Sequence, residues 1–278
     1  MKLSKGMLSL SVFLMISIGL FGHFFNDYMK VKAENIVKNR IDDYLQDLLD
    51  RIKNRRNILL TAAVILSKDK DVGKCLQKLE ETSCVEHLLR IQNSFSKINF
   101  AEGMKIHLHT KDFKSFFRVW DVNDKGDNLS LFRDSLELIK DTKKEVSGIE
   151  IGRFSMLIRG ISPVITHRDE YLGSIEVMSD FSSITGYFKK SDIDFFVLMY
   201  KKYQQVAIKI DYPINRRVGK FIVINSVNSE INSFRDIEFK DTGYKITKNY
   251  YVIYTPIYDI MGEKIGFYVL KILKKKLL

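Results

Sequence analysis

The segments ISPVITHRDEYLGSIEV (residues 161–177) and YTPIYDIMGEKIGFYVL (residues 254–270) decide the fold. In both, an aliphatic run that contains a proline leads through a polar turn into a run that contains a glycine. Apolar runs on either side of turn residues predict a β-hairpin. Because two hairpins of the same design occur in one chain, the sequence indicates an internal duplication.

Short β-rich runs surround the first hairpin. After Asn99 the sequence alternates between apolar and polar residues, and one helical segment, Leu129–Lys140, interrupts the alternation. Two strands, a helix and a closing set of strands are typical of a small α+β domain with one antiparallel sheet. The predicted strands are Met104–Thr110, Ser115–Trp120, Arg153–Ile165 and Tyr171–Met178.

The same order of elements starts again in the second half. A connecting helix at Phe181–Lys190 precedes another set of short apolar runs. We therefore expect a second α+β domain with an antiparallel sheet. Its predicted strands are Ile193–Tyr200, Val206–Ile210, Lys220–Asn225, Tyr250–Tyr258 and Lys264–Leu273.

A long amphipathic helix precedes both domains. Tyr28–Leu66 contains no Pro or Gly, and its apolar residues recur at spacings of three, four and seven. The apolar stripe from Ile36 to Leu66 suits either a second copy of the helix or the chain's own domains. A second helical piece is predicted at Cys84–Phe95. Cys75 and Cys84 either form a disulfide across the bend before it or remain two buried thiols.

Met7–Phe25 carries no formal charge and approaches the length that a membrane helix needs. A cleaved signal peptide is the alternative, but the run ends in Gly22, His23, Phe24 and Phe25 instead of small residues at a cleavage site. A retained membrane helix is therefore favoured. Lys and Arg flank the run on both sides, so charge does not settle its orientation.

Three blocks of the first domain carry a family resemblance: KIHLHTKDFKSFFRVWD (105–121), GDNLSLFRDSL (126–136) and SGIEIGRFSMLIRGISPV (147–164). With these blocks in this order, the chain resembles the double Cache family of extracytoplasmic sensors, found in methyl-accepting chemotaxis proteins and sensor histidine kinases. The resemblance implies an α+β fold with an N-terminal membrane helix, a long amphipathic helix and two PAS-like (Cache) domains with antiparallel sheets. The expected division is a cytoplasmic N-terminus (1–6), a transmembrane helix (7–25), the long helix with its helical bend (26–98), a membrane-distal Cache domain (99–180) and a membrane-proximal Cache domain (181–278).

Two departures from the family pattern affect these expectations. Small residues usually follow the arginine of the third block, whereas Arg153 is followed by Phe154, Ser155 and Met156. This bulk is expected to reshape the ligand pocket. Family members also continue into a second membrane helix and signalling modules, and this sequence ends at LKILKKKLL. It therefore resembles either a truncated receptor or a protein that acts through another chain.

The candidate ligand-binding residues lie in the first domain. Arg118 and Trp120 share one face of a strand, and a bidentate donor beside an aromatic wall suits a small organic anion. The alternative is a core tryptophan beside a surface ion pair. Arg159 lies in an apolar strand, where its charge needs a partner such as Glu150, Glu176 or a bound carboxylate. The predicted site is Arg159, Arg118, Trp120, Asp121, His109 and Glu150.

His107 and His109 also share a strand face, which invites a metal interpretation. No nearby cysteine supplies a third ligand, so we expect no metal and no cofactor. The family resemblance instead makes His109 a pocket residue or a hydrogen-bonding residue.

The sequence favours binding over catalysis. It contains no G-x-S-x-G, no phosphate-binding glycine loop and no H-E-x-x-H, so we expect no enzyme. The net charge of +11 is scattered through periodic segments, which disfavours a nucleic-acid partner. We expect a single-pass inner-membrane protein with its bulk in the periplasm, homodimeric through the long helix, that senses a small organic anion for chemotaxis or signal transduction. The alternative is a membrane-anchored binding or dimerisation protein without signalling output.

Overall fold

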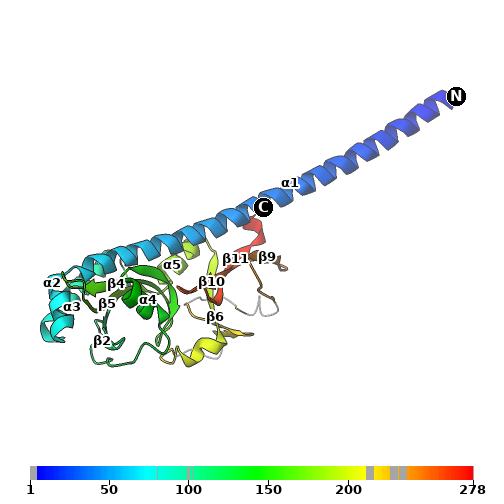
Figure 1. Ribbon diagram of the computed structural model, residues 1–278. Coiled ribbons are helices and arrows are strands. Elements are labelled where there is room, and N and C mark those ends of the chain that lie inside the picture. The colour runs from blue at the N-terminus through cyan, green and yellow to red at the C-terminus, as the bar shows by residue number, and fades with distance from the viewer. Residues whose placement is uncertain are drawn as a thin grey trace.

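The structure is a computed structural model in which a long helix runs beside two β-sheets (Figure 1). It describes residues 5–79, 81–98, 101, 103–210, 216–225, 231 and 237–277, with the backbone alone for residues 5–16 and 81–83. Its helices are α1 (Lys5–Ser67), α2 (Lys70–Lys78), α3 (Glu81–Phe95), α4 (Asp134–Thr142) and α5 (Ser182–Lys190), with 3₁₀ segments η2 (Lys201–Gln205) and η5 (Lys274–Lys276). Its strands are β1 (Lys105–Thr110), β2 (Ser115–Arg118), β3 (Val146–Ile151), β4 (Met156–Ile165), β5 (Tyr171–Ser179), β6 (Asp194–Tyr200), β7 (Arg217–Val218), β8 (Phe221–Val223), β9 (Gly243–Ile246), β10 (Tyr250–Tyr258) and β11 (Lys264–Leu273). The prediction of an α+β fold with a long helix and two antiparallel sheets is confirmed.

Helix α1 is continuous, and its N-terminal part projects beyond the body of the molecule (Figure 1). The predicted apolar stripe faces the chain's own sheets, and its buried residues are Val37, Ile41, Leu48, Ile52, Leu59, Ala63 and Leu66. Asp69 then caps α2, because its side chain accepts the backbone N–H groups of Asp71 and Val72. A disulfide joins Cys75 of α2 to Cys84 of α3.

The predicted membrane segment Met7–Phe25 lies within α1. The side chains of residues 7–16 are outside the part of the chain that the structure describes. Among the residues it does describe, no helix is both long enough and apolar enough to cross a membrane.

The sheet of the first domain, which we call the distal sheet after the expected domain order, has the strand order β2-β1-β5-β4-β3, with every pair antiparallel. Helix α1 packs on one face and crosses β4 at Gly160, where a Cβ atom would collide with the backbone of Leu59 and Leu60. Helix α4 covers the opposite face, where Leu136 and Ile139 pack with Ile161 of β4. The distal sheet therefore lies between two helices.

The proximal sheet repeats this design with the order β7-β8-β6-β11-β10-β9. Apart from the extra edge strand β7, its order matches that of the distal sheet, so β4 and β5 correspond to β10 and β11. The positions of Pro163 and Pro256 in the register agree as well, because each proline pairs with the residue that directly follows the glycine of its partner strand, Ser174 and Phe267 respectively. The matched orders support the predicted duplication.

Two predicted elements differ from the structure. Val206–Ile210 is not a strand, because the N–H groups of Val206 and Ala207 turn back to the carbonyl of Tyr203. The helix predicted from Leu129 begins only at Asp134, since a turn between Leu129 and Phe132 precedes it. Strand β3 was not predicted, although it pairs with β4 along its whole length.

Candidate functional site

Charged side chains occupy the face of the distal sheet that lies away from α1. Cross-strand pairing puts His107 opposite Glu176 and Arg118, and it puts Glu176 opposite Ile161, which packs on α4. The buried polar residues gathered between this face and the α4 region are His107, His109, Ser115, Arg118, Arg133, Ser135, Glu150, Arg159, Ser174 and Glu176. We call this set the distal polar cluster.

Two carboxylates and two guanidinium groups form its centre. Glu176 Oε1 accepts hydrogen bonds from Arg133 Nη2 at 2.6 Å and Arg159 Nη1 at 2.7 Å. Glu150 Oε2 accepts from Arg133 Nε at 2.5 Å and from the hydroxyl of Ser135 at 2.8 Å. All four charged side chains are buried. Charge pairs of this kind are stable only when their hydrogen bonds are satisfied, because burial removes both ions from water.

The two histidines lie beside this network. His107 Nδ1 and His109 Nε2 are 3.0 Å apart. His107 Nε2 contacts Ser115 Oγ at 2.8 Å, and His109 Nδ1 contacts Ser174 Oγ at 2.9 Å. Each imidazole is therefore held at both ring nitrogens.

The edge of the distal polar cluster is aromatic and partly open. Arg118 Nη2 bonds to Asp127 Oδ2 at 2.7 Å, and its other terminal nitrogen donates to the Asp124 carbonyl. The ring of Phe154 lies under Arg118 and packs edge-on against Trp120. Phe154 thus lies beside two of the predicted ligand residues, Arg118 and Trp120.

Burial and charge set the protonation states. Burial lowers the pKa of His107 well below 6.5, and it lowers the pKa of His109 in the same way. Burial alone would raise the pKa of Glu176, but Arg133 and Arg159 hold it well below 4.5. Burial lowers the pKa of Arg159, and Arg133 adds to the effect. The cluster therefore contains neutral imidazoles beside the ionised carboxylate of Glu176.

The family model described as the double sensory domain of two-component sensor kinase (dCache_3) matches residues 34–272. The chain belongs to the double Cache sensor family. No curated protein sequence matches it. A domain of a sensory box/GGDEF family protein from Vibrio parahaemolyticus has the same fold, with a TM-score of 0.53 at 13% identity over 88% of this chain and 98% of that one. The sensor domain of the Vibrio cholerae histidine kinase DctB gives a TM-score of 0.48 at 14% identity over 84% and 98%.

The two Cache domains differ sharply on corresponding faces. By strand register, Phe196 and Leu198 stand where the distal domain has His107 and His109, and Val269 stands where it has Glu176. Val252 likewise replaces Arg159. These proximal residues belong to an apolar cluster that also contains Val218, Phe221, Val223, Phe239, Tyr254 and Phe267. A Cache sheet therefore does not need a charged face to fold.

The structure places most of the predicted site residues together. Arg159, Glu150, His109 and Arg118 all lie in the distal polar cluster, and Trp120 borders it through its contact with His107. Asp121 does not join them: its side chain is exposed, and its backbone N–H bonds to the carbonyl of Arg118.

Sequence reasoning missed the central role of Arg133. This residue lies just before α4 and contacts both buried carboxylates, although it is far from them in the sequence. Its presence in the second family block, GDNLSLFRDSL, was the available signal.

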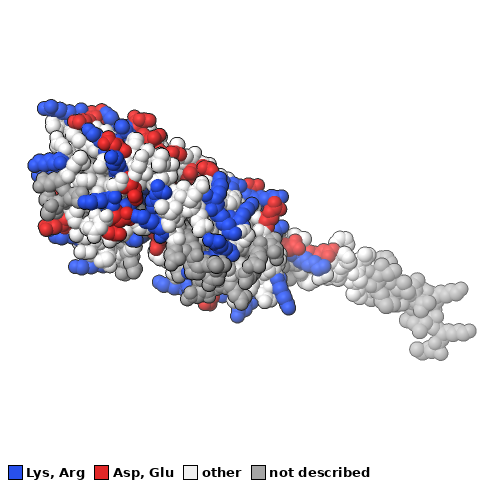
Figure 2. Space-filling view, turned by 90° about the horizontal axis from the view of Figure 1, so that it is seen from below, with Lys and Arg blue, Asp and Glu red and all other residues white. Residues whose placement is uncertain are grey.

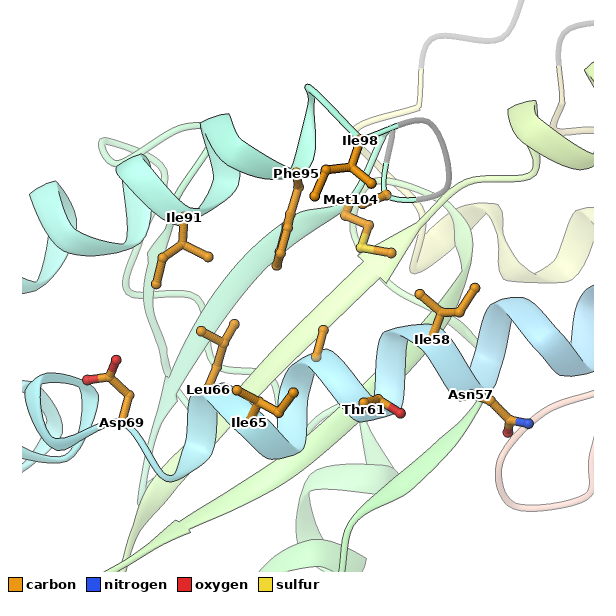
Figure 3. Close-up of a pocket in the computed structure, with 12 residues that line it drawn as sticks. Asn57, Ile58, Thr61, Ile65, Leu66, Asp69, Ile91, Phe95, Ile98 and Met104 are labelled. Carbon is orange, nitrogen blue, oxygen red and sulfur yellow. The ribbon is translucent and has the colours of Figure 1, made fainter.

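A separate apolar groove of about 610 Å³ opens between α1, α3 and the segment before β1 (Figure 3). Ile58 and Ile65 of α1 face Ile91 and Phe95 of α3 across it, and Met104 lies at one side (Figure 3). Its lining is almost entirely apolar, so it lacks groups that orient a small polar ligand. The distal polar cluster is the better candidate for ligand recognition in this Cache chain.

Proposed function

We propose that this chain is the extracytoplasmic ligand-sensing module of a bacterial chemoreceptor or sensor kinase, and that its distal domain binds a small organic anion. Binding and signal transmission, not catalysis, are the proposed activity. The observation that carries the proposal is the contrast between the two sheets. The distal domain keeps buried charges where the proximal domain packs apolar side chains, and buried ion pairs are often no more stable than apolar residues of similar volume. Such a cluster is better explained by recognition than by stability.

Arg118 is the proposed contact for the anion. Its guanidinium group is already bound to Asp127, whose side chain is 30% exposed, at the open edge of the cluster. A ligand carboxylate there competes with Asp127 for the same bidentate donor. Trp120 and Phe154 supply the aromatic wall, and Arg159 is buried against Glu176.

Contacts also connect this edge of the distal polar cluster to the second half of the chain. Asp124, which pairs with Arg118, also pairs with Lys209. The backbone N–H of Lys209 bonds to the carbonyl of Arg153 beside the same aromatic wall. Displacement of the loop that carries Asp124 would therefore alter a contact between the halves. A ligand drives this change only through different affinities for the two arrangements.

We propose further that the N-terminal part of α1 anchors the module in the inner membrane, with the sheets in the periplasm. Phe21, Phe24 and Phe25 are exposed on α1, and lipid would cover them. Residues 7–16 complete an uncharged run with them. Dimerisation through the exposed side of α1 is part of the same proposal.

On the face shown in Figure 2, acidic and basic side chains are interspersed over the body, which suits a small-molecule sensor better than a nucleic-acid binder.

A thermal-shift screen of the full chain in mild detergent tests the anion site. The screen contains small carboxylates, amino acids, amines and inorganic anions. A ligand at about a hundred times its dissociation constant adds roughly 2.7 kcal/mol to the free energy of unfolding, which raises the melting temperature by a few degrees. Arg118→Met should abolish the shift, and Arg168→Met on an exposed turn should preserve it. A folded wild-type chain that responds to no compound, or an Arg118→Met variant that responds normally, contradicts the proposal.

A further inference from the structure

Three side chains of the distal sheet direct donor atoms at one point. His107 and His109 lie on the same face of β1, and Glu176 lies opposite His107 on β5. Glu176 Oε2 is 3.4 Å from His107 Nδ1 and 3.6 Å from His109 Nε2. We infer that these three residues form a binding site for a divalent transition-metal ion, and that Zn²⁺ is the ion that best fits them.

The separations of the donor atoms suit a small tetrahedral ion. Zn²⁺ with bonds of about 2.0–2.1 Å keeps its ligand atoms about 3.3 Å apart. The three separations, 3.0, 3.4 and 3.6 Å, lie on both sides of this value. An ion therefore reaches all three atoms without a shift of either strand. Two histidines and a glutamate are also an established zinc donor set, in which a fourth position stays open to water or another ligand.

Glu176 supplies a second, independent observation. Its side chain is 0% exposed, and Oε2 is among the few buried side-chain atoms of the described residues that have no hydrogen-bond partner. Its other oxygen, Oε1, accepts from Arg133 and Arg159. A buried carboxylate oxygen without a donor is costly. A cation at the point of convergence supplies the missing interaction.

The outer contacts of the site match those of metal-bound histidines. In metal sites, the second ring nitrogen usually bonds to a neighbouring group that fixes the orientation of the imidazole. Here Ser115 and Ser174 hold His107 Nε2 and His109 Nδ1, which leaves the other nitrogens aimed at each other. The serines therefore present both imidazoles to the same point.

The surrounding charges do not exclude a cation. The basic side chains Arg118, Arg133, Arg159 and Lys209 are paired with the carboxylates Glu150, Glu176, Asp124 and Asp127. Together with the paired side chains of Asp124, Asp127 and Lys209 at its edge, the cluster therefore has equal numbers of basic and acidic groups before an ion binds. The metal site does not depend on the proposed anion site: a chain that binds Zn²⁺ and no organic anion would retain it.

A second group, Asp69, Asp71 and His87, also has donor atoms close together, but it serves better as an internal control. Asp69 already caps α2 with one oxygen and contacts His87 with the other. Its polar atoms therefore have partners within the protein. This group should not contribute to tight metal binding.

The test is a metal titration of the full chain after treatment with chelator and dialysis. Zn²⁺ should bind with a stoichiometry of one ion per chain, and Co²⁺ should give the visible absorption of a four-coordinate ion. His107→Ala and His109→Gln should each weaken binding at least 100-fold. Ser115→Ala keeps all three donor groups and should weaken it about 10- to 100-fold.

Matched controls are His87→Ala, in the Asp69 group, and His167→Ala, on an exposed turn; both should bind Zn²⁺ like the wild-type chain. Circular dichroism checks the fold of each variant, and Ser115→Ala keeps the test decisive if a histidine variant does not fold. No Zn²⁺ binding by the wild-type chain overturns the inference. Wild-type affinity in His107→Ala and His109→Gln, or loss of binding in His87→Ala, also overturns it.

Discussion

Gly173 of β5 and Gly266 of β11 occupy equivalent positions in the two sheets. A Cβ atom on Gly173 would lie against the carbonyl oxygen of His109, and one on Gly266 would lie against the carbonyl oxygen of Leu198. The glycine of each repeated hairpin therefore lets the central strands approach one another. This shared requirement explains why both hairpin segments, residues 161–177 and 254–270, contain a glycine at this position.

Substitution of either glycine should destabilise its sheet. Because the obstructing atom is backbone, Gly266→Ala should lower the free energy of unfolding by about 2 kcal/mol or more. Gly173→Ala should cost more, since Gly173 also has a φ of +146°. Gly186→Ala in α5, where a Cβ meets nothing within 4 Å, should be neutral or stabilising by up to about 1 kcal/mol. Denaturant unfolding measures all three, and equal costs at Gly266 and Gly186 would refute the explanation.

Neutralising Glu176 should be severely destabilising. Glu176→Gln leaves Arg133 and Arg159 without one of their buried carboxylates, a change that typically costs about 3–5 kcal/mol. Glu170→Gln, on an exposed turn, should change the free energy of unfolding by less than about 0.5 kcal/mol. Chemical denaturation in the presence of chelator separates this effect from metal binding. A Glu176→Gln chain as stable as the wild type would show that the ion pairs are dispensable.

The disulfide should stabilise the α2–α3 end of the molecule. Cys75 and Cys84 close a short loop, with a sequence separation of 9, for which chain entropy predicts about 2.6 kcal/mol. The Cys75→Ser and Cys84→Ser double variant should lose this amount and should become insensitive to reductant. The wild-type chain measured with reductant is the control, and it should match the double variant. A reductant-sensitive double variant would contradict this assignment.

Asp69 should contribute as a helix cap in a pH-dependent way. Burial would raise its pKa, but hydrogen bonds from His87 and from the N–H groups of α2 outweigh burial and hold the pKa below 3.8. The contribution is therefore present above pH 3.8 and is lost as the pH falls through the lowered folded-state pKa. At neutral pH, Asp69→Ala should cost about 1 kcal/mol.

Asp141→Ala is the matched control for the cap. Asp141 is exposed in α4, so its removal should not destabilise the chain. Thermal unfolding at neutral and acid pH measures both variants. A cost of Asp69→Ala that stays constant below pH 3 would exclude the carboxylate as its source.

The sequence predicted the elements whose periodicity is strong. The final hairpin, Tyr250–Tyr258 and Lys264–Leu273, is predicted to the residue, because its apolar runs end at clear turn residues. Val206–Ile210 was wrongly predicted as a strand, since its alternating apolar residues follow a 3₁₀ segment that turns the backbone back on itself. The local alternation of apolar and polar residues does not indicate that the backbone reverses direction there.

The site was harder to predict, because its contacts join residues that are distant in the sequence. The expectation of no metal considered only cysteine as a third ligand for His107 and His109. Glu176 becomes a neighbour only through the pairing of β1 with β5, and Arg133 only through the packing of the α4 region on the sheet. Individual site residues could be identified from the sequence, but which of them contact each other could be known only from the strand pairing and helix packing.

The continuity of the hydrophobic core along α1 has a mechanical consequence. One cluster includes Leu59 and Ala63 of α1, Ile158 and Val177 of the distal sheet, and Ile253 and Leu270 of the proximal sheet. Both sheets therefore pack on the same helix, and neither sheet can slide along α1 without disrupting the close packing of these side chains. A tilt of the distal sheet that preserves this packing therefore moves α1 with it, and in a continuous helix the displacement grows toward the projecting N-terminal part.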